Sequence, residues 1–206
     1  MSTLSGRNIT GNCPTILKSA PKQPKNYLLN PYFEGGGGIS ANPSQSDWAV
    51  AHWTPRGDFV SNLGQAWGPA WADYVMLGAL PPSVAGNNNS ATLETKLSQT
   101  NATALSPGSY LVSWYERYEC YPTSCDLNIS LGGVEISHRT LGTDQSNFGS
   151  ATGPLTLQKS VTVPITSQML STGNITLAFT ITGKSDDIND MKFWNIASPS
   201  LQYLGK

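Results

Sequence analysis

Two segments of the chain alternate between apolar and polar residues, and this period of two constrains the fold more than any other feature. In residues 175–182 (ITLAFTIT) every odd position is apolar and the even positions are Thr or Ala. In residues 155–163 (LTLQKSVTV) the odd positions are apolar apart from Lys159. Because successive side chains of a strand point to opposite faces, both segments are predicted to be strands with one face in a core and one toward solvent.

Similar short segments fill most of the chain after residue 26. Gly132-Gly133 is predicted to turn the strand 127–131 into 134–139 as a hairpin. No helical stripe of ~10 or more residues interrupts this pattern. Further strands are predicted at 53–54, 58–62, 74–77, 92–99, 110–114, 192–196 and 201–204. About eight to ten short strands with Gly and Pro turns predict one all-β domain over residues 27–206, an antiparallel β-sandwich of the jelly-roll type.

The charge balance excludes some partners. The chain has 206 residues, of which 12% are charged, and its net charge is -1. A nucleic-acid-binding domain normally has a clear basic excess, so no nucleic-acid partner is expected. No stretch approaches the roughly 20 apolar residues that span a bilayer, so no membrane insertion is expected. The start MSTLSGRNIT lacks an apolar run, so no secretory signal peptide is expected in this chain.

Residues 1–26 are predicted to form an extended N-terminal arm outside the sandwich. Pro14, Pro21 and Pro24 are incompatible with a regular helix or a central strand. The arm is basic, with Arg7, Lys18, Lys22 and Lys25 and no acidic residue before Glu34. Two interpretations are open: a solvated tail, or an assembly arm that a neighbouring subunit holds.

The three cysteines allow one short disulfide. Cys120 and Cys125 flank a short Tyr-Pro-Thr-Ser loop that a disulfide can close, while Cys13 lies in the arm. Three reduced thiols are the alternative. No Cys-x-x-Cys pair with His partners is present, which argues against a zinc site.

Two kinds of short motif recur too often by chance to decide a function. Asn-x-Ser/Thr sequons begin at Asn8, Asn88, Asn101, Asn128 and Asn174, and they imply glycosylation only if the chain meets a glycosylating system. Arg56-Gly57-Asp58 spells an integrin-type tripeptide, but the segment is expected to lead into a strand.

The order of several motifs resembles a known family. Tyr27–Glu34 (YLLNPYFE) is followed by Trp53, by a strand at 72–77 (ADYVML), and by 105–114 (LSPGSYLVSW). This series resembles carbohydrate-binding modules of the galactose-binding-like jelly-roll superfamily, and it extends over residues 27–204. The resemblance implies the same sandwich fold. Within it, Phe33, Trp53, Tyr110 and Trp114 are expected to be core aromatics rather than ligand contacts.

The family resemblance also implies a structural calcium ion. Its expected ligands are Glu34 and an Asp of the last strand. This chain has Phe193-Trp194-Asn195-Ile196 there instead, while Asp186, Asp187 and Asp190 lie in the preceding loop, and Asp190 is taken as the candidate. An oxygen-rich calcium site from Glu34 and Asp190 is therefore the cofactor expectation.

Catalytic motifs are lacking. His52 and His138 are the histidines available as bases near neutral pH, and no nucleophile elbow, metalloprotease helix or phosphate-binding loop occurs. Glycoside hydrolysis needs two carboxylates across a cleft. Glu116 and Glu119 lie on one strand end, and their spacing alone does not make them such a pair. The chain is predicted not to be an enzyme.

Sugar-binding candidates lie in a loop rich in Gly and Pro. Trp67 and Trp71 are placed where packing does not obviously require them, and exposed aromatic rings stack on sugars. The alternative is that this loop folds back and closes one end of the sandwich. Tyr118 and Tyr121 are secondary candidates.

Two functions follow from these observations. The first is a non-catalytic structural or surface protein of a larger particle, for example a viral minor capsid or virion surface component, with other subunits as partners. The second is a stand-alone extracellular carbohydrate-binding module that recognises glycans through loop aromatics. The lack of a signal peptide and the basic arm favour the first, and the family resemblance favours the second. The structural or surface role is the main expectation, and the carbohydrate-binding module is the alternative. The expected location is a virion or the extracellular or cell surface.

Overall fold

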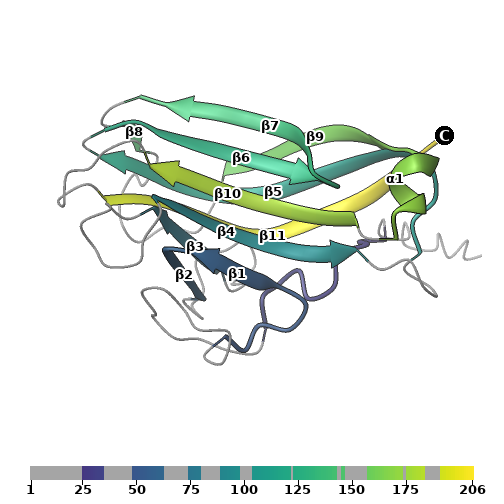
Figure 1. Ribbon diagram of the computed structural model, residues 1–206, viewed down its shortest axis with the longest axis horizontal. Helices are drawn as coiled ribbons and strands as arrows, with labels where there is room; N and C mark the ends of the chain where they lie inside the picture. The colour runs from purple at the N-terminus through teal and green to yellow at the C-terminus, as the bar shows by residue number, and fades with distance from the viewer. Residues whose placement is uncertain are drawn as a thin grey trace, which may run out of the picture.

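The protein folds as two antiparallel β-sheets packed face to face (Figure 1). This computed structural model describes residues 25–34, 48–62, 74–79, 89–97, 104–121, 123–142, 145–146, 157–173, 175–183 and 191–206. The elements are β1 Thr54–Gly57, β2 Phe59–Asn62, β3 Tyr74–Ala79, β4 Ser90–Leu97, β5 Gly108–Tyr121, β6 Cys125–Leu131, β7 Val134–Leu141, β8 Gln145–Ser146, β9 Leu157–Ile165, α1 Ser167–Ser171, β10 Ile175–Gly183 and β11 Met191–Gly205. The predicted all-β antiparallel sandwich is confirmed.

The strand order defines two open sheets. One has five strands in the order β1-β4-β10-β6-β7, and the other follows the order β2-β3-β11-β5-β8, with β9 also paired to β5. The strands lie along the long direction of the molecule, and α1 lies at the same end as the C-terminus (Figure 1).

The sequence predicted two final strands, at 192–196 and 201–204. The structure has one strand there, β11, whose pairing with β5 shifts register between Ala197 and Ser200. A local bulge explains why the sequence pattern breaks there.

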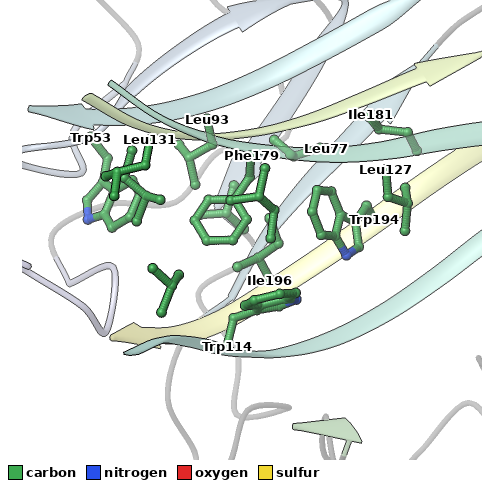
Figure 2. Close-up of a cluster of buried hydrophobic side chains, with 14 of the residues drawn as sticks. Trp53, Leu77, Leu93, Trp114, Leu127, Leu131, Phe179, Ile181, Trp194 and Ile196 are labelled. Atoms are coloured by element: carbon green, nitrogen blue, oxygen red, sulfur yellow. The ribbon is translucent and has the colours of Figure 1, made fainter. Parts of the chain in front are cut away.

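The core is aromatic at its centre. The odd residues of β10 are buried, as the alternation predicts, and Phe179 lies among three indoles (Figure 2). Its ring centroid is 5.7 Å from that of Trp194, 6.0 Å from that of Trp114 and 6.5 Å from that of Trp53. Such ring pairs add stabilisation beyond their buried area. Trp53 and Trp114 are therefore core residues, as predicted.

The Tyr27–Glu34 motif also has a structural role. Phe33 is fully buried against Trp53, with ring centroids 5.1 Å apart. The Trp53 indole N–H lies 3.0 Å from the Asn30 carbonyl oxygen, to which it donates. Tyr110 is likewise buried, and its hydroxyl donates to the Ser106 carbonyl at 2.9 Å. The four predicted core aromatics are all in the core.

The last residues of the predicted arm lie against the sandwich. Asn26 forms a β-bridge with Gln202, and its side-chain oxygen accepts the Leu201 N–H at 3.0 Å. The Lys25 ammonium lies 4.5 Å from the centre of the Tyr27 ring, a cation–π contact. Arg7, Lys18 and Lys22 lie outside the described residues.

A disulfide links the two sheets at one end. Cys120 near the end of β5 is bonded to Cys125 at the start of β6, with Cα atoms 5.7 Å apart, and both residues are fully buried. Because β5 and β6 belong to different sheets, the bond holds the layers together where the chain crosses between them.

The Arg56-Gly57-Asp58 tripeptide is part of the framework. Asp58 is 1% exposed, and its carboxylate accepts the Ser90 N–H at 2.9 Å while its own N–H donates to the Ser90 carbonyl at 2.8 Å. Gly57 has φ +89°, a conformation that favours glycine. A buried Asp cannot act in an exposed recognition loop, so this tripeptide is structural.

Candidate functional site

The outer face of the five-stranded sheet is almost wholly polar. The even-numbered residues of β4, β6 and β10 point away from the core, since the odd-numbered ones are buried. A single row crosses all five strands through the pairings of Arg56, Thr92, Thr180, Asn128 and His138. The set of outward residues is Thr54, Arg56, Ser90, Thr92, Glu94, Lys96, Asp126, Asn128, Ser130, Glu135, His138, Thr140, Thr176, Ala178, Thr180 and Thr182. We call this set the polar face.

Side chains on the polar face orient one another. The Arg56 guanidinium forms an ion pair with Glu94 at 2.8 Å, and the Thr92 and Thr180 hydroxyls are 2.9 Å apart. These contacts hold the groups in place while leaving hydrogen-bonding capacity toward solvent, because guanidinium, carboxylate and hydroxyl groups each make several bonds.

A β-bulge assembles the most connected part of the polar face. Glu135 and His138 are three residues apart, and in a regular strand they would point to opposite faces. The register shifts between Ile129 and Ser130, which pair with Ser137 and Glu135, so β7 carries an extra residue. His138 Nδ1 consequently lies 3.1 Å from Glu135 Oε2 on the same face. The bulge could not be predicted from the alternation.

β6 supplies a further partner of His138. The His138 Nε2 atom lies 3.4 Å from Asp126 Oδ1, which also accepts the Thr140 hydroxyl at 2.6 Å. Asn128 donates its side-chain amide to Glu135. The hydrogen bond to Glu135 is the main cause that raises the pKa of His138 above 6.5, with Asp126 adding to it. The positive charge is favoured because two carboxylates face the ring.

A second polar cluster lies inside the sandwich, at Glu116. Its side chain is fully buried, and its Oε2 atom accepts the indole N–H groups of Trp114 at 2.8 Å and Trp194 at 3.0 Å. Arg139 Nη2, reaching in from β7, donates to the same oxygen at 2.7 Å. The Oε1 atom has no hydrogen-bond partner within the described part of the chain.

The structure separates the two carboxylates that the sequence placed on one strand end. Glu116 faces the core with Trp114, whereas Glu119 belongs to the other face of β5. They do not face each other across a cleft. The sequence does contain a signal for Glu116, because it continues the inward series of Tyr110, Val112 and Trp114, where an acid needs a partner.

The tyrosine candidates lie at different places. Tyr118 is half-buried, and the Arg139 guanidinium lies 5.5 Å from the centre of its ring. Tyr121, at the end of β5, is 55% exposed. Trp67 and Trp71 lie outside the described residues, so a sugar site on that loop stays a prediction.

The calcium expectation also stays a prediction. Glu34 is exposed, and its backbone N–H donates to Asn30 Oδ1 at 2.8 Å. Asp190 lies outside the described residues. Within those residues, no group of three or more His, Cys, Asp or Glu side chains is suited to a metal ion.

A hollow of about 310 Å³ lies between the β6–β7 turn and α1, apart from both polar clusters. Its lining combines Val134 and Met169 with Thr166, Gln168, Thr172 and Gly132. None of the helices in the described ranges is long and apolar enough to cross a bilayer.

No family model and no curated protein matches this sequence. Several solved structures have a similar sandwich. The xylan-binding domain from CBM 22 shares 16% identity, with a TM-score of 0.45 over 90% of this chain and 99% of that chain. The CBM22-2 xylan-binding domain of Paenibacillus barcinonensis Xyn10C shares 12%, with a TM-score of 0.45 over 75% and 92%.

An enzyme also has a similar sandwich. The Stig cyclase Fisc from Fischerella sp. TAU shares 10% identity, with a TM-score of 0.46 over 85% of this chain and 94% of that chain. The similarity to carbohydrate-binding modules that the motifs predict is thus found among solved structures. At these values we base no functional argument on it, and the function must be argued from the residues.

Proposed function

We propose that this domain is a non-catalytic carbohydrate-binding module and that a saccharide lies on the polar face. The single observation that carries the proposal is the row of outward polar side chains crossing all five strands, from Arg56 to His138. Their guanidinium, hydroxyl, amide and imidazole groups offer both hydrogen-bond donors and acceptors. The hydroxyl groups of a sugar can pair with both kinds.

The size of the polar face suits an oligosaccharide. Strands lie ~4.8 Å apart, so the face is about 20 Å wide, and the nine residues of β10 extend about 30 Å. The bulge adds preorganisation, because Glu135 and Asp126 are held by hydrogen bonds before a ligand arrives. Fixed polar groups lose little entropy on binding.

A binding role is better supported than a catalytic one. The buried Glu116 is paired with Arg139 and two indoles, so it is not presented to a substrate. Asp126 and Glu135 are both engaged with His138 at the surface rather than lining an enclosed site. The expectation of a particle component depended on the arm, which lies largely outside the described residues, and no described contact favours it.

The test is binding of the purified protein to a glycan array and to insoluble polysaccharides, with calcium present. The variants Asn128→Ala and His138→Ala remove donors from the polar face. The matched control is Thr162→Ala, an exposed position on β9 of the other sheet. We expect each of the two face variants to weaken glycan binding at least about tenfold, because each loses hydrogen bonds to the sugar. The control variant should bind as tightly as the wild type.

Other outcomes would redirect the assignment. Full binding by the face variants, with loss on Trp67→Ala or Trp71→Ala, would place the site on the aromatic loop. The absence of binding to every glycan would contradict the proposal and favour a structural role in an assembly.

A further inference from the structure

The hollow between the β6–β7 turn and α1 lies at one end of the sandwich, at the end where the C-terminus lies (Figure 1). None of its lining residues belongs to the polar face. Its volume of about 310 Å³ is near the lower end of the range of roughly 300–1,000 Å³ that small-ligand sites occupy. The hollow therefore has room for one sugar unit rather than for a chain of them.

Val134 and Met169 form the apolar part of this lining. Val134, the first residue of β7, is 59% exposed, and Met169 packs partly buried against the core. A Cβ added at Gly132 would lie 3.0 Å from the Met169 methyl carbon, so this methyl group lies close to the bare backbone of the turn. The turn is held in place because the Gly132 N–H donates to the Thr176 carbonyl at 2.8 Å. These walls favour a ligand with a small apolar group, which gains free energy by leaving water.

Two threonine hydroxyls on the same lining are oriented by the backbone of Met169. The Thr166 hydroxyl oxygen accepts the Met169 N–H at 3.2 Å, so its own proton can be donated to a ligand. The Thr172 hydroxyl donates its proton to the Met169 carbonyl at 2.8 Å, so toward a ligand it acts as an acceptor. The hollow consequently presents one oriented donor and one oriented acceptor.

The spacing of these two threonines suits a secondary amide. Thr166 and Thr172 directly precede and follow α1, and six residues of helix rise about 9 Å. The N–H and C=O groups of a trans amide point in opposite directions. In a β-sheet such an amide bonds to two neighbouring strands that each lie about 4.8 Å away. An amide between the two threonines therefore has partners at a similar separation.

The lining matches an acetamido group in each of its parts. Such a group has a carbonyl oxygen for the donor, an N–H for the acceptor and a methyl group for the apolar walls. Gln168, exposed on α1, adds a side-chain amide that can pair with the hydroxyl groups of a sugar ring.

We propose that this hollow binds the acetamido group of an N-acetylated amino sugar. Thr166 donates to the amide carbonyl, Thr172 accepts the amide N–H, and the methyl group packs on Val134 and Met169. The choice of a sugar as the carrier of the amide rests on the proposed function, whereas the choice of an acetamido group rests on the lining. The module then distinguishes N-acetylated amino sugars from plain hexoses at this end of the sandwich.

The test compares two sugars that differ only at C2. Titrations of N-acetylglucosamine and glucose, followed by NMR shifts of the backbone amides in labelled protein, measure the contribution of the acetamido group and locate it. We expect N-acetylglucosamine to bind at least about tenfold more tightly, because it gains two hydrogen bonds and buries a methyl group. The shifted amides should include those of Gly132, Val134 and Met169.

Three results would overturn the proposal. The first is equal binding of the two sugars, and the second is a set of shifts that leaves the lining of the hollow unchanged. The third is equally tight binding of N-methylacetamide, because the sugar body then contributes nothing.

A matched pair of variants tests the acceptor. Thr172→Val removes the hydroxyl and is expected to weaken N-acetylglucosamine binding about fivefold or more. The control is Ser171→Ala, because the Ser171 hydroxyl also donates to a carbonyl three residues earlier, that of Gln168 at 2.7 Å, but does not line the hollow. The control should bind as tightly as the wild type. An equal loss in both variants would assign the effect to α1 as a whole and overturn the assignment.

A variant on the opposite wall tests the apolar contact without touching α1. Val134→Ser removes apolar surface at an exposed position and should weaken N-acetylglucosamine binding about threefold while leaving glucose binding unchanged. Unchanged binding of N-acetylglucosamine in this variant would contradict the placement of the methyl group.

The two proposals fail separately. If glycans bind the polar face but N-acetylglucosamine leaves the amides of the hollow unshifted, this inference is wrong and the proposed function stands. If N-acetylglucosamine binds the hollow equally well in Asn128→Ala and no glycan depends on the polar face, the polar face is wrong and the hollow stands.

Discussion

Glu116 and Arg139 meet inside the sandwich from different sheets, with Glu116 Oε2 and Arg139 Nη2 2.7 Å apart. Among the ion pairs of the described residues, this is the one that joins the two layers. The indoles of Trp114 and Trp194 donate to the same oxygen, so three side chains, from strands β5, β11 and β7, are bonded to one carboxylate.

Loss of the arginine should destabilise the fold strongly. Arg139→Ala leaves a fully buried carboxylate without its cation, and we expect the free energy of unfolding to fall by about 3–5 kcal/mol. Urea unfolding measures the change. The double variant Glu116→Gln/Arg139→Met keeps an acceptor for the indoles and removes both charges, so it should lose much less. A loss below ~1 kcal/mol in Arg139→Ala would contradict the buried-pair account.

Removal of the disulfide should have a moderate effect. The loop that Cys120–Cys125 closes is short, with a sequence separation of 5, so its entropic contribution is about 2 kcal/mol. We expect Cys120→Ala/Cys125→Ala to lower the free energy of unfolding by about that amount. Reductant should destabilise the wild type and leave the variant unchanged. Equal sensitivity of both proteins to reductant would argue against this bond.

Stability should depend on pH through His138. Its pKa is raised in the folded protein, chiefly by the hydrogen bond to Glu135, so the folded state binds the proton more tightly than the unfolded chain. The stabilisation is therefore complete below the unfolded pKa of about 6.5 and is lost as the pH rises through the folded pKa. His138→Gln should flatten the change in urea midpoint between about pH 5.5 and 8. Identical pH profiles for both proteins would show that His138 contributes nothing.

Two glycines with positive φ should differ in their tolerance of a side chain. Gly57 has φ +89°, and an added Cβ would collide with the Ser90 carbonyl oxygen. Gly133 has φ +79°, but a Cβ there meets nothing within 4 Å. We expect Gly57→Ala to cost more than Gly133→Ala, which should cost about 1 kcal/mol from backbone strain alone. Thermal unfolding compares them, and equal melting temperatures would mean that the Ser90 contact yields easily.

The sequence predicted the fold well where the pattern is local. The alternation in 175–182 identified the faces of β10, and the Gly132-Gly133 turn identified the β6–β7 hairpin. Local signals suffice there because the two faces of a strand follow directly from its period. The core aromatics followed from their places in the motifs that resemble the family.

The sites depended on tertiary structure. Glu135 and His138 share a face only because the bulge in β7 adds a residue, and no period predicts a bulge. Glu116 and Arg139 lie 23 residues apart and meet only because β5 and β7 face each other from different sheets. In the regular strands, the sequence alone therefore determined which side chains face inward, because that depends on neighbours in the chain. The tertiary structure decided which of them meet, because pairing and layer packing bring together residues that no local pattern connects.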